Sequence, residues 1–484
     1  MLNEIQKQIE RIKNKGATYV DSRWYPSEDS NVLVMLNGNL KAAAMSGESG
    51  IGIRVLYKGA WGFSASSDIS NISALYEKAF DNARIASERV TFPVRLAEKD
   101  IIQAKFESPC QINPFEIPLA EKVSFLKEID EKLDQAGVFQ RMSSLSFVRK
   151  QIVFVDSEGS QIEKLITEVF ASMQVSGLDD QGATYERTFR PARQGYTRGW
   201  ESIDKNLFSE NAARIVKEMN QVRVADECPK EDRSVILLPN IMYLQTHETI
   251  GHALELDRIL GYELAFAGGS FVTLADFGTL RYGSPLLTAR ADATLPNSPG
   301  SFGFDDDGVP AQNTLLIDKG LLVGAITGRQ MVEEANAKAR RQIFKGSGGT
   351  NRATSFYRVP IERMTNINID PGQDGTLDDI VSKTEKGIVL DSERSWSIGS
   401  NREQFHFGTE IGWLVEDGKI TRVVRNPTYK GATVKFWNSL SAVGDQSTWQ
   451  VKYVDNCGKG QPNQAMQLGH GVPVCRFGNV RIGE

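Results

Sequence analysis

The chain has 484 residues, enough for two to four domains, of which two large ones are a reasonable expectation. Its 40% hydrophobic and 24% charged residues are ordinary for a globular protein, and a net charge of −5 gives no reason to expect nucleic-acid binding. Four scattered cysteines are too few for a disulfide framework. No stretch approaches the roughly 18 apolar residues of a membrane-spanning helix, and the first residues lack a signal-peptide core. We therefore predict a cytoplasmic protein that does not enter membranes.

The first half of the chain predicts helices and antiparallel strands, in the same order twice. The first set is a helix at the start, strands over 17–65 and a helix over 71–87. Asn37-Gly38 and Lys58-Gly59 are hairpin turn signals within it. The second set is a helix over 117–135, strands over 138–190 and a helix over 205–222, after a linker at 91–118. Together they predict an α+β domain over 1–226, with helices on an antiparallel sheet and an internal duplication in topology.

The second half predicts a strand-rich catalytic domain over 227–484 that carries one functional helix. After a buried strand at 235–238, Pro239-Asn240 breaks the strand and a helix follows. Beyond it lie short strands and glycine turns, with helices predicted over 329–340 and 432–441. The Gly-, Ser- and Arg-rich segment 344–354 is predicted to be a mobile loop. The run Asp305-Asp306-Asp307 is predicted to be a solvated turn, because it lacks the ligand spacing of a calcium loop.

Two histidines within that helix are the strongest chemical signal in the chain. His247 and His252 account for half of the four histidines, and Glu248 directly follows the first of them. Two imidazoles can hold a metal ion, and an adjacent carboxylate can act as a base toward water. The pattern predicts the active site of a metallopeptidase, with a chance surface cluster as the competing interpretation.

The spacing of the two histidines requires a distorted helix. They are five positions apart, which places them roughly 140° apart around a regular α-helix. Both side chains cannot then reach one ion. A wider π-type turn would bring them together, and Gly251 could ease it. We therefore predict a bulge or kink between Glu248 and His252.

The residues alone leave the third ligand open. A catalytic zinc ion usually takes three protein ligands and one water. His406, between aromatic residues, is predicted to be a strand residue, and His470 a loop residue rather than a ligand. The remaining candidates are two nearby carboxylates, a cysteine in a glycine-flanked turn and a cysteine in a strand-like run: Glu255, Asp257, Cys457 and Cys475.

Several blocks of sequence carry a resemblance to a known family. They are 247–255, 304–312, 314–320, 357–366, 369–372 and 456–459 in the second half, and 36–40 and 50–56 in the first. These blocks resemble the motifs of the TldD family, the metallopeptidase half of the TldD/TldE (PmbA) system, once described as modulators of DNA gyrase. The block at 247–255 is similar to the family's HExxxH motif, and Asn456–Lys459 to its cysteine block. The resemblance covers essentially the whole chain.

The resemblance implies a zinc site of His247, His252 and Cys457, with one ion per active chain and Glu248 as the catalytic base. It also implies a cytoplasmic peptidase for flexible or unfolded peptides, including peptides under maturation. TldD-like chains pair with a TldE-like partner that lacks the metal motif; a homodimer is the other possibility. This chain keeps the motif and so resembles the catalytic member. The alternative is a metal-stabilised binding or regulatory subunit without turnover.

Overall fold

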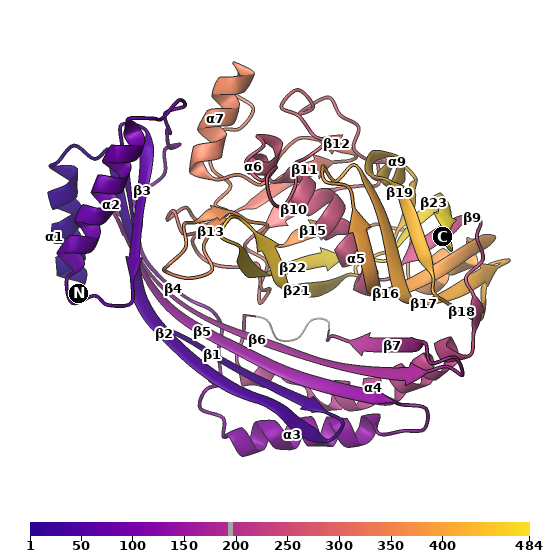
Figure 1. The fold of residues 1–484 in the computed structure, drawn as a ribbon. Coiled ribbons are helices and arrows are strands. Elements are labelled where there is room, and N and C mark those ends of the chain that lie inside the picture. Colours follow the sequence, from indigo (N-terminus) through magenta and orange to yellow (C-terminus); the bar gives the residue numbers. More distant parts are fainter. Residues whose placement is uncertain (192–196) are drawn as a thin grey trace.

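The structure is a computed structural model that describes residues 1–191 and 197–484 (Figure 1). Its first half has the predicted α+β character, with a helix, antiparallel strands and a helix in each set. The first set comprises α1 (Leu2–Lys13), β1 (Tyr19–Leu36), β2 (Asn39–Tyr57), β3 (Ala60–Ser66) and α2 (Ile72–Ser87). The second comprises α3 (Leu119–Leu133), β5 (Gln140–Asp156), β6 (Gln161–Leu178), β7 (Thr184–Phe189), the 3₁₀ turn η1 (Trp200–Ser202) and α4 (Lys205–Arg223). The predicted linker contains one strand, β4 (Gln103–Glu107).

The two sets share one sheet of seven strands in the part of the chain that the structure describes. Its order is β3-β2-β1-β5-β6-β4, with β7 paired to β6, so the antiparallel β1–β5 pair joins the two sets. β1 and β2 are each one continuous strand. A shift in pairing between Tyr25 and Glu28 accommodates Pro26, because proline cannot donate to a strand ladder.

Helices cover this sheet at both ends of its long, arched strands (Figure 1). α3 and α4 pack on β1, β5 and β6 through a core that includes Phe125, Ile129 and Phe208. α1 and α2 pack at the other end through Ile5, Ile9 and neighbouring residues. The strands arch beneath the second half of the chain, and their inner face meets the C-terminal strands described next.

The second half is rich in short strands, as predicted. Its largest sheet, eight-stranded over the described residues, has the order β16-β9-β23-β19-β17-β18-β8, and β20 pairs with β23. A further pairing between β16 and β17 closes part of it into a ring. The members are β8 (Asp226–Glu227), β9 (Asp232–Leu237), β16 (Lys386–Ile398), β17 (Gln404–Glu416), β18 (Lys419–Arg425), β19 (Thr428–Ala432), β20 (Leu440–Val443) and β23 (Cys475–Ile482).

Smaller sheets and helices surround the ring. A four-stranded sheet contains β10 (Ala289–Asp292), β11 (Asn313–Asp318), β12 (Leu321–Leu322) and β15 (Ile367–Ile369). Two hairpins are β13 (Asn351–Arg352) with β14 (Ile361–Glu362), and β21 (Gln450–Lys459) with β22 (Gln464–Val472). The helices are α5 (Pro239–Thr246), α6 (Leu256–Ile259), α7 (Arg329–Ala339), α8 (Leu377–Ser382) and α9 (Thr433–Asn438). Within the described ranges, none of the helices is both long and apolar enough to cross a membrane. The domain division between 226 and 227 stays a prediction.

The prediction of a solvated turn at Asp305–Asp307 is wrong. All three carboxylates are buried, and two of them bind cations from the N-terminal sheet. Lys164 Nζ lies 2.6 Å from an Asp306 oxygen, and Arg54 Nη2 lies 2.6 Å from an Asp307 oxygen. Asp305 instead accepts the backbone N–H groups of its own turn. The ion pairs of Asp306 and Asp307 thus connect the N-terminal sheet to the C-terminal half.

The prediction that segment 344–354 is a mobile loop is also wrong, because this segment is packed against the rest of the protein. Most of it is buried, and it contributes strand β13. Gly348 donates its backbone N–H to the Thr327 carbonyl, and the Asn351 side chain donates to Asp307. Gly348 and Gly349 therefore reflect close packing between chain segments and do not indicate a lid.

Replacing Arg54 with Met tests the contact between the halves. Arg54 is 4% exposed and binds both Asp21 and Asp307, so Arg54→Met leaves two buried carboxylates without that cation. We expect a loss of about 3–5 kcal/mol in unfolding free energy, measured by denaturant titration. Arg84→Met, which removes only two exposed ion pairs, should cost less than about 1 kcal/mol. Equal losses in the two variants would contradict this assignment.

Candidate metal centre

The two motif histidines lie at the end of a buried helix whose backbone changes pitch between them. α5 begins at Pro239, which suits the first helical position because it has no N–H to donate. Residues His247–Gly251 then form a π-turn, in which His252 donates its backbone N–H to the His247 carbonyl. A 3₁₀ turn, η3 (His252–Leu254), follows. The predicted distortion between Glu248 and His252 is confirmed.

Neighbouring side chains stabilise the π-turn. The Thr249 carbonyl accepts the Tyr282 hydroxyl, and the Thr249 hydroxyl accepts the Trp437 indole N–H at 2.9 Å. Gly251 is needed for packing, because a Cβ there would lie 2.1 Å from the Met364 sulfur. Tertiary contacts therefore favour a turn that sequence propensity alone would not select.

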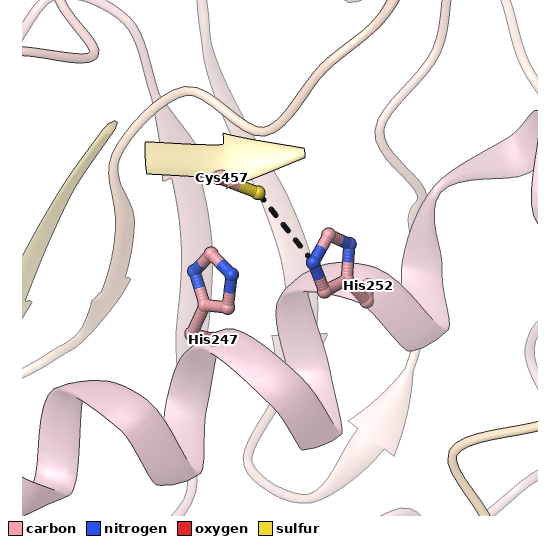
Figure 2. A group of neighbouring side chains, drawn as sticks. All are labelled: His247, His252 and Cys457. Carbon is pink, nitrogen blue, oxygen red and sulfur yellow. Dashed lines mark hydrogen bonds between the residues drawn. The ribbon is translucent and has the colours of Figure 1, made fainter. Parts of the chain in front are cut away.

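The turn brings both imidazoles to one side, where Cys457 faces them from strand β21 (Figure 2). The ring centroids of His247 and His252 are 4.7 Å apart. Cys457 Sγ lies 3.5 Å from His252 Nε2, and potential ligand atoms of all three residues lie within 4.8 Å of one another. Nitrogen and sulfur ligands of a tetrahedral zinc ion lie about 3.6 Å apart, given bonds of about 2.05 and 2.3 Å. The donor set therefore fits a metal ion of this kind.

His470 fixes the orientation of the His247 ring. His470 Nδ1 lies 3.2 Å from the Ile367 carbonyl, which can only accept, so this nitrogen carries the proton. In the neutral ring Nε2 is then an acceptor, and it lies 2.8 Å from His247 Nδ1. His247 therefore donates from Nδ1 and keeps its Nε2 lone pair for a metal ion. The prediction that His470 lies in a loop is wrong, since it is a fully buried residue of β22.

A carboxylate fixes the second imidazole in the same way. His252 Nδ1 lies 2.9 Å from Glu255 Oε2, which accepts its proton, so Nε2 is left facing Cys457. Glu255 also accepts from Arg258 at 2.6 Å and lies 3.3 Å from the Lys459 ammonium. Lys459, His252 and Arg258 together keep the pKa of Glu255 well below its usual range despite burial. Glu255 is thus a partner of a histidine and not a third ligand in this arrangement.

The protonation states suit metal binding. Burial lowers the pKa of both His247 and His252 to about 4, so both rings are neutral at pH 7. Burial alone would raise the pKa of the Cys457 thiol, but His252 and Arg363 outweigh it and the pKa lies below its ordinary value. Zinc binds neutral imidazoles and a thiolate, and a lowered thiol pKa makes the thiolate easier to form.

The other candidate ligands lie outside this cluster, as far as the described residues show. Asp257 pairs with Lys459 at 2.7 Å. Cys475 is buried in β23, in the predicted strand, and burial raises its pKa strongly. His406 is an exposed residue of strand β17, as predicted for its strand position. The sequence analysis missed Arg258 and Arg363 as supporting residues, and no local sequence signal marks them.

Glu248 directly follows His247 in the π-turn, and its side chain is buried. Its side chain is 10% exposed, and Arg402 Nη1 approaches its Oε2 at 3.4 Å. This oxygen has no hydrogen-bond partner within the described residues. The carboxylate is therefore placed to accept a proton from a bound molecule.

Comparison with known proteins assigns the whole chain to one family. Residues 230–484 match the model for the PmbA/TldA metallopeptidase C-terminal domain. Residues 27–83 and 112–220 match the models for domain 1 and the central domain of the same family. The expected resemblance to TldD is confirmed.

Curated relatives cover the chain almost from end to end. A metalloprotease of Methanocaldococcus jannaschii is 28% identical, covering 96% of this chain and 97% of that protein. A metalloprotease TldD homolog of Haemophilus influenzae is 26% identical over 98% of this chain and 94% of its own. A zinc metalloprotease TldD homolog of Saccharolobus solfataricus is 23% identical, with 99% of both chains covered.

Solved structures share the fold at low identity. A Thermotoga maritima protein that carries the label modulator of a DNA gyrase has a TM-score of 0.76 at 15% identity, with 100% of both chains covered. TldE from Thermococcus kodakarensis has a TM-score of 0.70 at 16% identity, with 99% of both chains covered. Together with the family models over all three segments and the metalloprotease relatives, these matches show that the chain belongs to the PmbA/TldA metallopeptidase family.

Proposed function

We propose that this metallopeptidase is a zinc enzyme that hydrolyses flexible or unfolded peptides, with His247, His252 and Cys457 as ligands. The observation that carries the proposal is the convergence of these three buried side chains, with both imidazoles oriented by partners at Nδ1. Three protein ligands drawn from His, Cys and carboxylate side chains, with a free fourth position, are typical of catalytic zinc. The Saccharolobus solfataricus relative is named a zinc metalloprotease, which supports this choice of metal.

Glu248 is the proposed general base. A bound zinc ion would supply Lewis acidity, which acidifies water and polarises the scissile carbonyl. Glu248 takes the proton of the attacking water and passes it to the leaving amine nitrogen. Its unpartnered oxygen and its place next to His247 in the π-turn support this role.

The structure of the hairpin that carries Cys457 favours a substrate that binds in an extended conformation. β21 pairs with β22 along one edge, and Asp455 and Asn456 beside the cysteine are exposed. A peptide that adds to a strand edge is held by backbone hydrogen bonds, which gives weak sequence preference and requires an unfolded chain. Peptides under maturation fit this description.

The active form is proposed to be a dimer with a TldE-like chain, with a homodimer as the alternative. The fold similarity to TldE from Thermococcus kodakarensis supports such a partnership. The cytoplasmic location stays a prediction.

Digestion of a folded protein and of its denatured, alkylated form tests the substrate class. We expect cleavage of the denatured form only, blocked by a zinc chelator and restored by added zinc. The assay is run with the chain alone and with a TldE-like partner, and products are identified by mass spectrometry. Equal cleavage of both substrates would contradict the requirement for an unfolded chain, and chelator-resistant cleavage would contradict the zinc mechanism. Absence of cleavage under every condition would favour a binding subunit.

Replacing Cys457 with Ala tests the thiolate ligand. Replacing a residue that hydrogen-bonds to a metal ligand typically lowers metal affinity by about 10–100-fold. Loss of a ligand itself should lower the affinity at least as much. We expect zinc content after dialysis, measured by mass spectrometry of the metal, to fall well below that of the natural protein. Cys475→Ala is the matched control, because Cys475 is equally buried but outside the cluster. Full zinc content in Cys457→Ala would exclude Cys457 as a ligand.

Replacing Glu248 with Gln separates base catalysis from metal binding. The amide keeps the shape of the side chain but cannot take a proton, so kcat should fall by about 10²–10⁴-fold while zinc content stays unchanged. Initial rates on a fluorogenic peptide and zinc analysis of the same sample provide the measurement. A Glu248→Gln enzyme within tenfold of the natural rate would rule out this base.

A further inference from the structure

The guanidinium group of Arg402 comes from a loop far along the chain from the motif helix. It lies close to the proposed base, Glu248, and to the cluster of proposed ligands. Arg402 belongs to the turn between β16 and β17, and its side chain is 11% exposed. Nη1 lies 3.4 Å from Glu248 Oε2, and Nη2 donates to the Ala267 carbonyl at 2.9 Å. Burial lowers the pKa of Arg402, and the neighbouring Glu248, Glu255 and Cys457 oppose that shift. Arg402 therefore adds a positive charge to the centre from outside the motif helix.

The turn between β16 and β17 holds the backbone of Arg402 in an energetically unfavourable conformation. Its φ of 66° is left-handed, which costs a non-glycine residue about 1–2 kcal/mol. The Arg402 carbonyl accepts the Thr433 hydroxyl, and its N–H donates to the Gly399 carbonyl at 2.8 Å. Phe271 fastens the same turn by donating its N–H to the Asn401 carbonyl. The position of the guanidinium is thus fixed by the fold before any substrate binds.

The side chains of Arg402 and Glu248 do not form a good hydrogen bond with each other. Their 3.4 Å separation exceeds the usual 2.7–3.2 Å of an N–H···O bond. Within the described residues, Glu248 Oε2 and Arg402 Nε have no hydrogen-bond partner. An unsatisfied buried polar group costs about 1–3 kcal/mol, so two of them on neighbouring side chains indicate groups kept for a ligand. One group accepts a proton, and the other donates hydrogen bonds.

We propose that Arg402 is a further catalytic residue, which donates hydrogen bonds to the scissile carbonyl oxygen as it becomes an oxyanion. The inference rests on the proposed function. As Glu248 removes a proton from water, the water oxygen bonds to the carbonyl carbon and the carbonyl π electrons move to its oxygen. Arg402 N–H groups stabilise that negative charge. When the carbonyl re-forms, the C–N bond breaks and the amine leaves with the proton from Glu248.

Arg402→Met and Arg402→Lys, in the full chain with any required partner, test the proposal. Loss of an oxyanion donor typically lowers kcat by about 10²–10³-fold, and KM should change little because the donor acts on the transition state. A phosphinic peptide carries a tetrahedral anion, so its calorimetric affinity should fall by a similar factor in Arg402→Met. Zinc content should stay at the natural level, and Arg402→Lys should recover part of the loss.

Controls separate this role from others. Arg281→Met removes a different arginine-to-carbonyl hydrogen bond on the surface of the same half and should leave kcat and inhibitor affinity unchanged. If Arg402 only positions Glu248, kcat falls but phosphinic-peptide affinity is unchanged, which overturns the proposal. Loss of zinc or of thermal stability in both Arg402 variants would assign it a structural role and also overturn it. If the natural protein itself neither cleaves peptides nor binds the inhibitor, the proposed zinc-peptidase function fails first.

Discussion

The metal centre depends on one departure from α-helical geometry. Histidines five positions apart face different sides of a regular helix, but the π-turn over His247–Gly251 brings their rings to a 4.7 Å centroid separation. Tyr282 and Trp437 stabilise the turn by donating hydrogen bonds to Thr249. The absence of a side chain at Gly251 allows Met364 to pack against it. The chemistry of the motif is therefore set by contacts with residues far along the chain.

The same dependence extends to the ligands and their partners. Cys457 and His470 come from the β21–β22 hairpin, some 200 residues after the motif helix, and Lys459 on that hairpin contacts Glu255. One hairpin thus supplies a proposed ligand, the partner that orients His247 and a cation that supports the partner of His252. The buried aspartates at 305–307 in turn bind the N-terminal sheet through Arg54 and Lys164. The centre cannot assemble until the C-terminal half has folded around the helix.

Local signals in the sequence predicted local structure well. Asn37 and Gly38 both adopt positive φ at the predicted turn, and Asn71 caps the predicted helix by accepting the Ala74 N–H. The helical distortion followed from spacing alone. Signals that depend on distant partners failed: Asp306 and Asp307 are buried against the cations Lys164 and Arg54 of the N-terminal sheet. His470 was predicted to be a loop residue, but it lies in strand β22, where a Cβ at the neighbouring Gly471 would lie 1.9 Å from Trp449. Cys457 was distinguished from the other candidate ligands only by family resemblance.

X-ray absorption at the zinc edge of the zinc-loaded protein tests the central claim most directly. The account predicts one sulfur scatterer at about 2.3 Å and two imidazole nitrogens at about 2.0–2.1 Å, with a light atom in the fourth position. The imidazole signal should fall by half in His252→Ala, and the sulfur shell should disappear in Cys457→Ala. A natural protein with only nitrogen and oxygen scatterers around zinc would contradict the assignment of this centre.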